Sequence, residues 1–241
     1  MSIATHPVRR VTEGLPMPRD QWPATIPAVA QVLDEGLDLE PGVTFLVGEN
    51  AAGKSTLLEA IAIAAGLPAE GGNRQLDEHS WVTESALSEH LQLARGLHSS
   101  EGFFLRAETM HGYFTRLAER GSPRGAQLHA RSHGESFLDL SHQSMRRRGF
   151  YCLDEPESAL SYTSTLALVA RLAELARDGS QILCATHSPI LCALPGATIL
   201  ELTDAGIAPC PWEDLALVQS WRAFFTDPGR QLHHVLGLEN L

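Results

Sequence analysis

Apolar runs of four or five residues alternate along the chain with longer segments in which helix-forming residues predominate. The first run, residues 43–47, follows a Pro-Gly turn and stops at Gly48, as buried strands do. Helix-forming residues then fill 54–65, and Gly66 with Pro68 beyond it provides a conventional C-terminal stop. The pattern therefore predicts a strand, a short turn and a helix in direct succession.

Two later apolar runs, residues 150–153 and 182–185, also end in polar residues, and helical segments follow them at 161–177 and 189–194. Strands that alternate with helices indicate an α/β fold class with a mostly parallel central sheet covered on both faces. Residues 179–200 contain no Asp, Glu, Lys or Arg, but polar residues and two prolines interrupt them. We therefore expect a strand, a loop and a second strand there, not a membrane span.

The central part of the chain has a different pattern. It contains one strand-like run, residues 102–105, among short helical stretches, so we expect an inserted, mainly helical subdomain. The predicted helical stretches are 84–97, 110–119 and 137–147. The expected divisions are 1–66 for the first part of the core, 67–149 for the helical subdomain, 150–210 for the second part of the core and 211–241 for a C-terminal helical tail.

Turn-forming residues organise the last part of the chain. After residue 200, the Asp204-Ala205-Gly206 turn predicts a terminal hairpin. Residues 212–236 then predict a pair of helices that is broken at Pro228, because proline interrupts the helical hydrogen-bond pattern.

Composition and charge limit the classes of protein to consider. Hydrophobic residues make up 44% and charged residues 20% of 241 residues, which is typical of a soluble folded protein with one large domain or a core with an insertion. The 29 acidic and 18 basic residues give a formal charge of −11, the wrong sign for a protein that mainly neutralises DNA phosphates. The arginines at 146–148 are interpreted first as a solvated face, with a nucleic-acid or acidic-partner contact as the less favoured alternative.

Cysteine usage and the first residues bear on the compartment. The four cysteines form no CxxC pair and no cluster with histidine, so we expect buried, reduced thiols and neither a zinc site nor a disulfide framework. The N-terminal residues lack the apolar core of a signal peptide. We therefore expect a cytoplasmic protein with no membrane span of its own.

Residues 48–56 match the pattern GxxxxGK[ST] between a predicted strand and a predicted helix, the context that this phosphate-binding motif requires. A short loop bounded by glycines lets backbone N–H groups surround the terminal phosphates of a nucleotide, and the helix N-terminus adds partial positive charge. Lys54, the only lysine in the chain, would reach the phosphate oxygens, and Ser55 would offer its hydroxyl to Mg2+. The predicted binding residues are Gly48, Glu49, Asn50, Ala51, Ala52, Gly53, Lys54, Ser55 and Thr56.

Two adjacent carboxylates, Asp154 and Glu155, follow the apolar run 150–153. Parallel sheets bind ligands at this end of their strands. An acidic pair of this kind is by itself commonly part of a turn. When it follows a phosphate loop along the chain, it predicts the acidic Walker B motif. Asp154 is expected to hold Mg2+, and Glu155 to orient and polarise the water that attacks the terminal phosphate.

Four motifs in order resemble the motif set of ATP-binding-cassette (ABC) ATPases: GENAAGKST at 48–56, SHGES at 132–136, LDEPESAL at 153–160 and ATHSP at 185–189. More narrowly, they resemble the small stand-alone bacterial AAA-family or ABC-like ATPases related to SMC-type DNA-repair heads. The resemblance covers residues 22–202 and implies an ABC-type P-loop NTPase fold, with ATP and Mg2+ as cofactors.

The resemblance also implies roles for residues outside the phosphate loop. Ser132 and Gly134 match the Ser and the second Gly of the signature motif LSGGQ, which in that family contacts the γ-phosphate bound to the opposite subunit. His187 matches the switch histidine, which hydrogen-bonds the γ-phosphate. The expected catalytic residues are thus Lys54, Glu155 and His187, in an ATP-dependent homodimer.

This sequence departs from the family pattern at several positions. His133 and Glu135 replace Gly and Gln of the signature motif, and Ser161 stands where the family usually has an Asp. No clear glutamine stands directly after the strand-like run 103–105, where the family has its lid glutamine, and Glu108 is the alternative there. Trp22 is interpreted as a core residue, with stacking on the adenine base as the less favoured role.

The leading functional hypothesis is an ATP-hydrolysing homodimeric clamp. The alternatives are the ATP-binding subunit of an ABC transporter, a DNA-associated SMC-like head and a P-loop kinase, although SHGES and ATHSP have no role in kinase chemistry. A further protein partner remains unidentified, and nucleic acid is a less favoured partner.

Overall fold

The computed structural model describes residues 6–69, 72–73, 86–96, 101–106 and 133–236. These residues form a seven-stranded sheet in the order β10-β9-β3-β8-β7-β6-β4. Five neighbouring strands, from β9 to β6, are parallel, and the two edge strands pair antiparallel. The bounds are β3 (Gly42–Gly48), β4 (Gly72–Asn73), β6 (Gly102–Arg106), β7 (Phe150–Asp154), β8 (Gln181–Thr186), β9 (Thr198–Thr203) and β10 (Gly206–Pro209). The predicted mostly parallel α/β sheet is confirmed.

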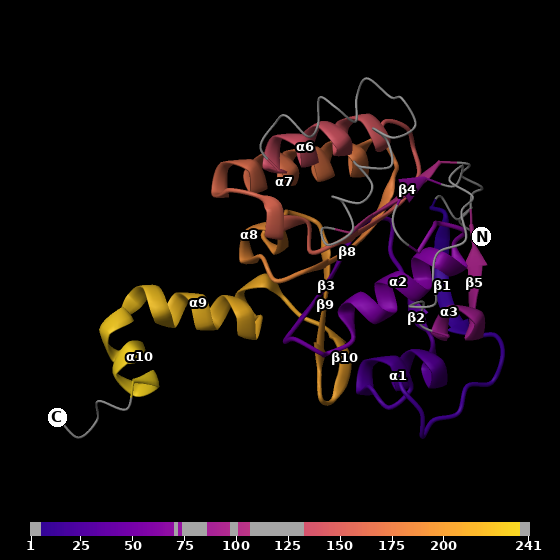
Figure 1. Ribbon diagram of the computed structural model, residues 1–241, viewed down its shortest axis with the longest axis horizontal. Helices are drawn as coiled ribbons and strands as arrows, with labels where there is room; N and C mark the ends of the chain where they lie inside the picture. Colours follow the sequence, from indigo (N-terminus) through magenta and orange to yellow (C-terminus); the bar gives the residue numbers. More distant parts are fainter. Residues whose placement is uncertain (1–5, 70–71, 74–85, 97–100, 107–132, 237–241) are drawn as a thin grey trace.

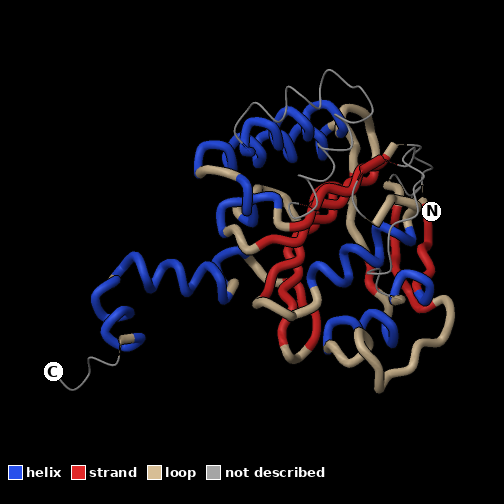
Figure 2. Tube along the Cα trace, in the orientation of Figure 1, coloured by secondary structure: helices blue, strands red, loops and turns tan. Residues whose placement is uncertain are grey.

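Helices cover both faces of this sheet, and Figure 2 shows the strands in red between two layers of blue helices. Along β3, Leu46 packs in the cluster on one face, while Phe45 and Val47 pack in the cluster on the other. A strand buried on both faces is apolar without alternation, as the sequence of β3 is. The helices on the Leu46 face are α1 (Pro27–Glu35) and α2 (Lys54–Ala64); α6 (His133–Ser144) and α7 (Tyr162–Arg177) lie on the other.

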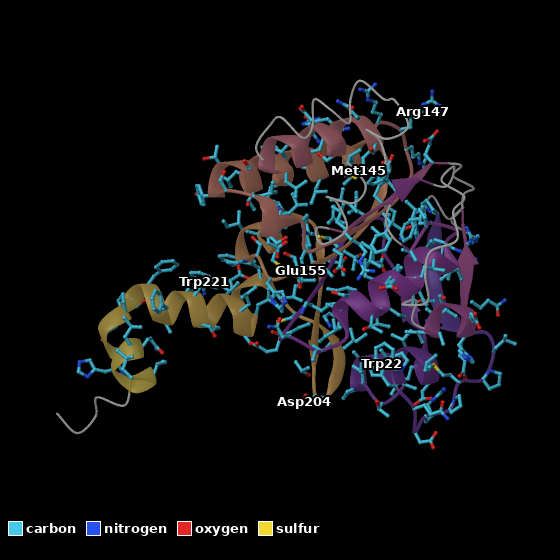
Figure 3. All side chains as sticks on the ribbon, in the orientation of Figure 1. Trp22, Met145, Arg147, Glu155, Asp204 and Trp221 are labelled. Atoms are coloured by element: carbon cyan, nitrogen blue, oxygen red, sulfur yellow. The ribbon has the colours of Figure 1, made fainter. Side chains whose placement is uncertain are left out.

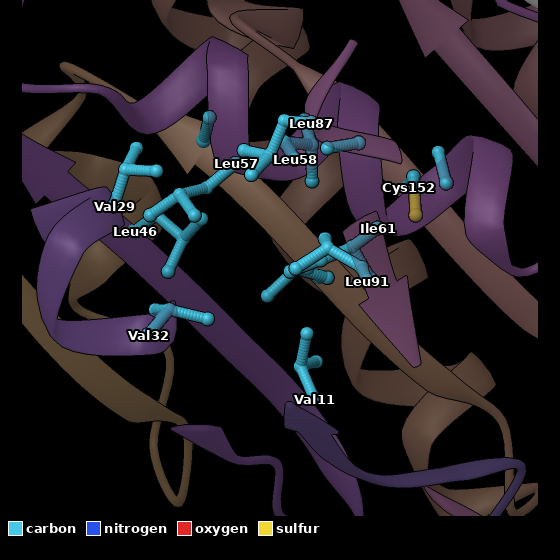
Figure 4. Packing of buried hydrophobic residues seen from close by; sticks show 14 of the residues in the cluster. Val11, Val29, Val32, Leu46, Leu57, Leu58, Ile61, Leu87, Leu91 and Cys152 are labelled. Atoms are coloured by element: carbon cyan, nitrogen blue, oxygen red, sulfur yellow. The ribbon is translucent and has the colours of Figure 1, made fainter. Parts of the chain in front are cut away.

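A second, antiparallel sheet extends the core on the α2 side. It consists of β1 (Val8–Glu13), β2 (Leu37–Asp38) and β5 (Leu91–Arg95) in the order β2-β1-β5. Figure 4 shows its contribution to the core, where Val11 and Leu91 lie near Ile61 of α2. The phosphate-loop helix is therefore packed between two sheets.

The helix predicted over residues 84–97 is wrong. The described part of this segment forms only a short helix, α3 (Leu87–His90), and then the strand β5. Leu91 and Leu93 pair with Glu13 and Val11 of β1, so hydrogen bonding to a distant strand overrides the local helical preference. The predicted helix 110–119 lies outside the described residues, and the helix predicted at 137–147 begins earlier, at His133, and ends at Ser144.

The chain ends in two helices that extend from the body. The predicted hairpin is formed by β9 and β10, and the short helices α8 (Pro189–Cys192) and η2 (Trp212–Asp214) precede α9 (Ala216–Thr226) and α10 (Pro228–Val235). The predicted helix pair broken at Pro228 is confirmed, and Figure 1 shows it projecting away from the sheet. An apolar groove of about 690 Å³ lies between α7, α8 and α9. Among the described residues, none of the helices combines the length and apolarity needed to cross a membrane.

Candidate active site

The loop between β3 and α2 requires glycine at both ends. A Cβ at Gly48 would overlap the Leu202 carbonyl oxygen, and a Cβ at Gly53 would lie 2.9 Å from Ile26 Cγ2. Gly53 also has a φ of 96°, in the left-handed region that glycine adopts without strain. It is the N-cap of α2, so the loop directs backbone N–H groups of the first helical turn toward its own centre.

Lys54 spans this loop with its side chain. Its Nζ donates hydrogen bonds to the carbonyl oxygens of Gly48 and Glu49, each at 2.9 Å, and the residue is only 4% exposed. Burial lowers the pKa of the Lys54 ammonium, while the negative charges of Glu155 and Asp154 oppose that shift. The loop therefore holds a cation where phosphate oxygens would bind.

Ser55 and Asp154 are joined across the sheet edge. The Ser55 hydroxyl, in the first turn of α2, donates to Asp154 Oδ1 at 2.8 Å, and Asp154 is 7% exposed at the end of β7. A hydroxyl and a carboxylate beside a phosphate loop are the oxygen ligands that Mg2+ prefers. The donor set of this structure thus fits a magnesium ion held by Ser55 and Asp154.

Arg106, at the end of β6, also contributes to this edge, and the sequence analysis missed it. Its Nη1 donates to Glu59 Oε2 at 2.8 Å, and its Nε lies 3.7 Å from Asp154 Oδ2. Its guanidinium also lies over the ring of Phe104, 5.8 Å from the centroid. The sequence signal for Arg106 is its place directly after the strand-like run 102–105. Neighbouring parallel strands end at the same edge of a sheet, so a charged residue there is expected near Asp154.

Glu155 and His187 face each other from the ends of β7 and β8. Glu155 has a left-handed backbone, with φ 46° and ψ 51°, so the chain turns sharply after Asp154. Its Oε1 lies 3.5 Å from His187 Nε2, and the two side chains are 42% and 32% exposed. Figure 3 shows Glu155 near the middle of the molecule. A carboxylate and an imidazole therefore lie together at the sheet edge where the parallel strand β3 leads into the phosphate loop.

Glu157 is a second residue that the sequence analysis did not identify. Its Oε1 accepts hydrogen bonds from Thr186 Oγ1 at 2.7 Å and from the His187 N–H at 2.5 Å. The only sequence signal for it is a second acidic residue two positions after Glu155.

The other predicted residues are only partly placed. Gly134 lies in the first turn of α6, whereas Ser132 and the lid alternative Glu108 lie outside the described residues. Ser161 caps the N-terminus of α7. Trp22 is 64% exposed, beside α1 (Figure 3), so its interpretation as a core residue is wrong. Among the remaining predicted binding residues, Glu49, Asn50 and Ala51 are exposed, and Ala52 and Thr56 are half-buried.

Known families and proteins match the same regions. An AAA domain family matches residues 27–98, and a second AAA domain family, whose description names the AbiEii toxin of a Type IV TA system, matches residues 126–193. The ribose import ATP-binding protein RbsA 2 of Escherichia coli O157:H7 is 29% identical over 197 residues. The arabinose import ATP-binding protein AraG of Burkholderia pseudomallei (strain 1710b) is 28% identical over 185 residues.

The fold agrees with these matches. A solved metal-chelate type ABC transporter in an inward-facing conformation aligns over 91% of this chain and 89% of its own, with a TM-score of 0.51 and 15% identity. At that identity the likeness shows the fold alone. The chain is thus similar to ABC-like P-loop ATPases in its motifs, its sequence matches and its fold. The matches to the two sugar-import relatives cover 70% and 67% of this chain, but the chain spans only 37% of the length of each relative.

Proposed function

We propose that this ATPase binds ATP with Mg2+ between two copies of itself and hydrolyses it, so that the dimer closes with ATP and opens after hydrolysis. The observation that carries the proposal is the grouping of Lys54, the Ser55–Asp154 hydrogen bond and the Glu155–His187 pair at one edge of the sheet. Phosphoryl transfer needs positioning and charge stabilisation at such an edge more than covalent chemistry.

Each residue has a role that its position supports. Lys54 and the backbone N–H groups of the loop would bind the terminal phosphates. Ser55 and Asp154 would hold Mg2+, which supplies Lewis-acid stabilisation of phosphate charge when bound. Glu155 would orient the attacking water and accept its proton, because its carboxylate is 42% exposed and its negative charge acts on Lys54 of the loop. His187 would donate a hydrogen bond to the γ-phosphate.

The second copy would complete the site through its signature motif. By the family resemblance, Ser132 and Gly134 of one copy would contact the γ-phosphate held by the other copy. ATP would then favour the closed dimer because these contacts exist only there, and loss of the γ-phosphate would remove them.

Replacing Glu155 tests this proposal. Glu155→Gln removes the proton acceptor but keeps the shape, so we expect an ATP-dependent dimer and a fall in kcat of about 100-fold or more. Light scattering with Mg-ATP measures the dimer, and phosphate release measures kcat. Glu174→Gln on α7, where the side chain is 50% exposed, is the matched control. A Glu155→Gln protein that stays monomeric at all ATP concentrations contradicts the clamp.

A second candidate function is the ATP-binding subunit of an ABC transporter. It is supported by the names of the two sugar-import relatives. A transporter subunit would co-purify with a polytopic membrane protein when expressed in its own host, and its kcat would rise in that complex. For the stand-alone clamp, the rate of ATP hydrolysis should instead depend only on the concentrations of protein and ATP. At low protein concentration this rate should increase with the square of the protein concentration.

A further inference from the structure

Directly after Glu155, the chain makes a turn that contacts Thr186 and His187 at the end of β8. Residues Pro156–Ala159 form one 3-10 turn, η1. The Ser158 N–H and Oγ–H both donate to the Glu155 carbonyl oxygen, at 3.1 and 2.9 Å, and close this turn. The Glu155 N–H in turn donates to the Ala185 carbonyl oxygen at 3.0 Å. The carboxylates of Glu155 and Glu157 therefore reach different parts of one segment, the residues that end β8.

Glu157 Oε1 organises that segment. It accepts from the Thr186 hydroxyl at 2.7 Å and from the His187 backbone N–H at 2.5 Å. Thr186 Oγ1 then accepts from the Ser188 N–H at 2.9 Å, and Ser188 Oγ accepts from the Leu191 N–H to cap α8. One carboxylate oxygen thus fixes the backbone between β8 and α8.

His187 is consequently held through its backbone, and its ring Nε2 is buried without a hydrogen bond among the described residues. Glu157 binds its backbone N–H, and Glu155 Oε1 lies 3.5 Å from its ring Nε2. Since the ring direction follows from the backbone position, a displacement of the His187 N–H would move the imidazole relative to Glu155 and to the phosphate loop.

Glu157 acts here as a hydrogen-bond acceptor. Its Oε2 is buried and makes no hydrogen bond among the described residues, and the ion pairs in that part of the chain do not include Glu157. An amide oxygen in the same position could accept both hydrogen bonds as a carboxylate oxygen does. A glutamine at position 157 should therefore preserve the segment, whereas an aliphatic side chain should not.

We propose that Glu157 is a positioning residue that sets the His187 imidazole against Glu155 and the terminal phosphate. This inference rests on the proposed hydrolysis at the same site. Glu157 itself is assigned no contact with nucleotide, because its accepting oxygen is occupied by Thr186 and His187.

The test compares Glu157→Leu with Glu157→Gln. Glu157→Leu should lower kcat on the order of 10- to 100-fold, as misplacement of a reacting group does, while the Kd for a fluorescent ATP analogue changes less than about threefold. Glu157→Gln should retain kcat within about threefold. Glu174→Leu, the same change at a half-exposed position on α7 that pairs with Arg171 at 2.9 Å, is the control for loss of an acidic side chain and of its ion pair. In a His187→Ala background, Glu157→Leu should cause no further loss of kcat.

A readout without nucleotide separates this inference from the proposed function. The NMR resonances of the His187 ring should shift in Glu157→Leu and remain in place in Glu157→Gln and Glu174→Leu. A wild-type protein that hydrolyses no ATP contradicts the proposed function, and the ring resonances still decide the inference. Unchanged resonances in Glu157→Leu, or a further loss of kcat in the His187→Ala background, overturn it. Should Glu157→Leu fail to fold, a more than tenfold loss of kcat in folded Glu157→Gln overturns it as well.

Discussion

Lys54 combines two properties that ordinarily oppose each other, burial and charge. Its Nζ is satisfied by two carbonyl oxygens of the loop, yet burial lowers its pKa despite the nearby Glu155 and Asp154 carboxylates. A buried ammonium of this kind is poorly solvated by water, so phosphate oxygens can bind it with little further loss of hydration. Burial of this ammonium lowers the free energy of unfolding of the protein without nucleotide.

The pH dependence of the free energy of unfolding measures this destabilisation. Because the pKa of Lys54 lies below its ordinary value of 10.5 in the folded state, the unfolded chain holds the proton more tightly. The contribution of Lys54 to the free energy of unfolding should therefore increase as pH rises from the lowered pKa to 10.5. We expect the difference between wild type and Lys54→Met to increase in the same direction, as measured by urea denaturation between pH 8 and 10.5.

Lys54 is the only lysine, so no other lysine contributes to that difference. Lys54→Met should also weaken ATP binding about tenfold or more at pH 7.5, since charge-assisted hydrogen bonds are lost. A stability difference that stays flat or declines with pH would show that burial does not disfavour the charged form.

The N-terminal cap of helix α7 is Ser161, which follows shortly after the Asp154-Glu155 pair along the chain. Ser161 Oγ accepts from the Ser164 N–H at 3.2 Å, and the Ser161 carbonyl oxygen accepts from Thr165 Oγ1 at 2.9 Å. The position at which the family resembled by the motifs usually has an Asp is thus a capping position in this chain, and Asp is as good a cap as Ser.

Substitutions at Ser161 should separate capping from other roles. Ser161→Ala removes the side-chain acceptor and should lower the free energy of unfolding by about 1 kcal/mol. Ser161→Asp keeps an acceptor and adds negative charge at a helix N-terminus, so its stability should remain within about 0.5 kcal/mol of wild type. Thermal and urea denaturation measure both variants, and an equal loss in the two would contradict the capping role.

Elements could be predicted from the sequence where local pattern and tertiary position agree. Strands β3, β7 and β8 are apolar on both faces because helices cover both sides of the sheet, and their polar ends place Asp154, Glu155 and His187 at one edge. Strand β1 was not predicted because its sequence, VRRVTE, is mostly polar and its pairing partners lie far along the chain. The roles of Arg106 and Glu157 depend on contacts between separate strand ends, which no local pattern specifies.

At the scale of the whole molecule, the C-terminal helices are attached to the body at one end. Leu215 is fully buried and Val218 is 2% exposed, both in the core on the α7 side of the sheet. Further along α9, Trp221 is 44% and Phe225 is 69% exposed, and their rings stack with centroids 5.3 Å apart. Figure 1 shows the same divergence, since α9 begins at the body and leads away from it.

This attachment predicts an inverse relation between side-chain size and stability loss. Leu215→Ala leaves a cavity in the core and should lower the free energy of unfolding by about 2–5 kcal/mol. Phe225→Ala removes a larger side chain but mainly one exposed to water, so the loss should be about 1 kcal/mol or less, much of it from stacking on Trp221. Urea denaturation at a low protein concentration measures both. If Phe225→Ala instead costs as much as Leu215→Ala, the outer face of α9 must be covered in solution, because exposed aromatic surface cannot supply that free energy.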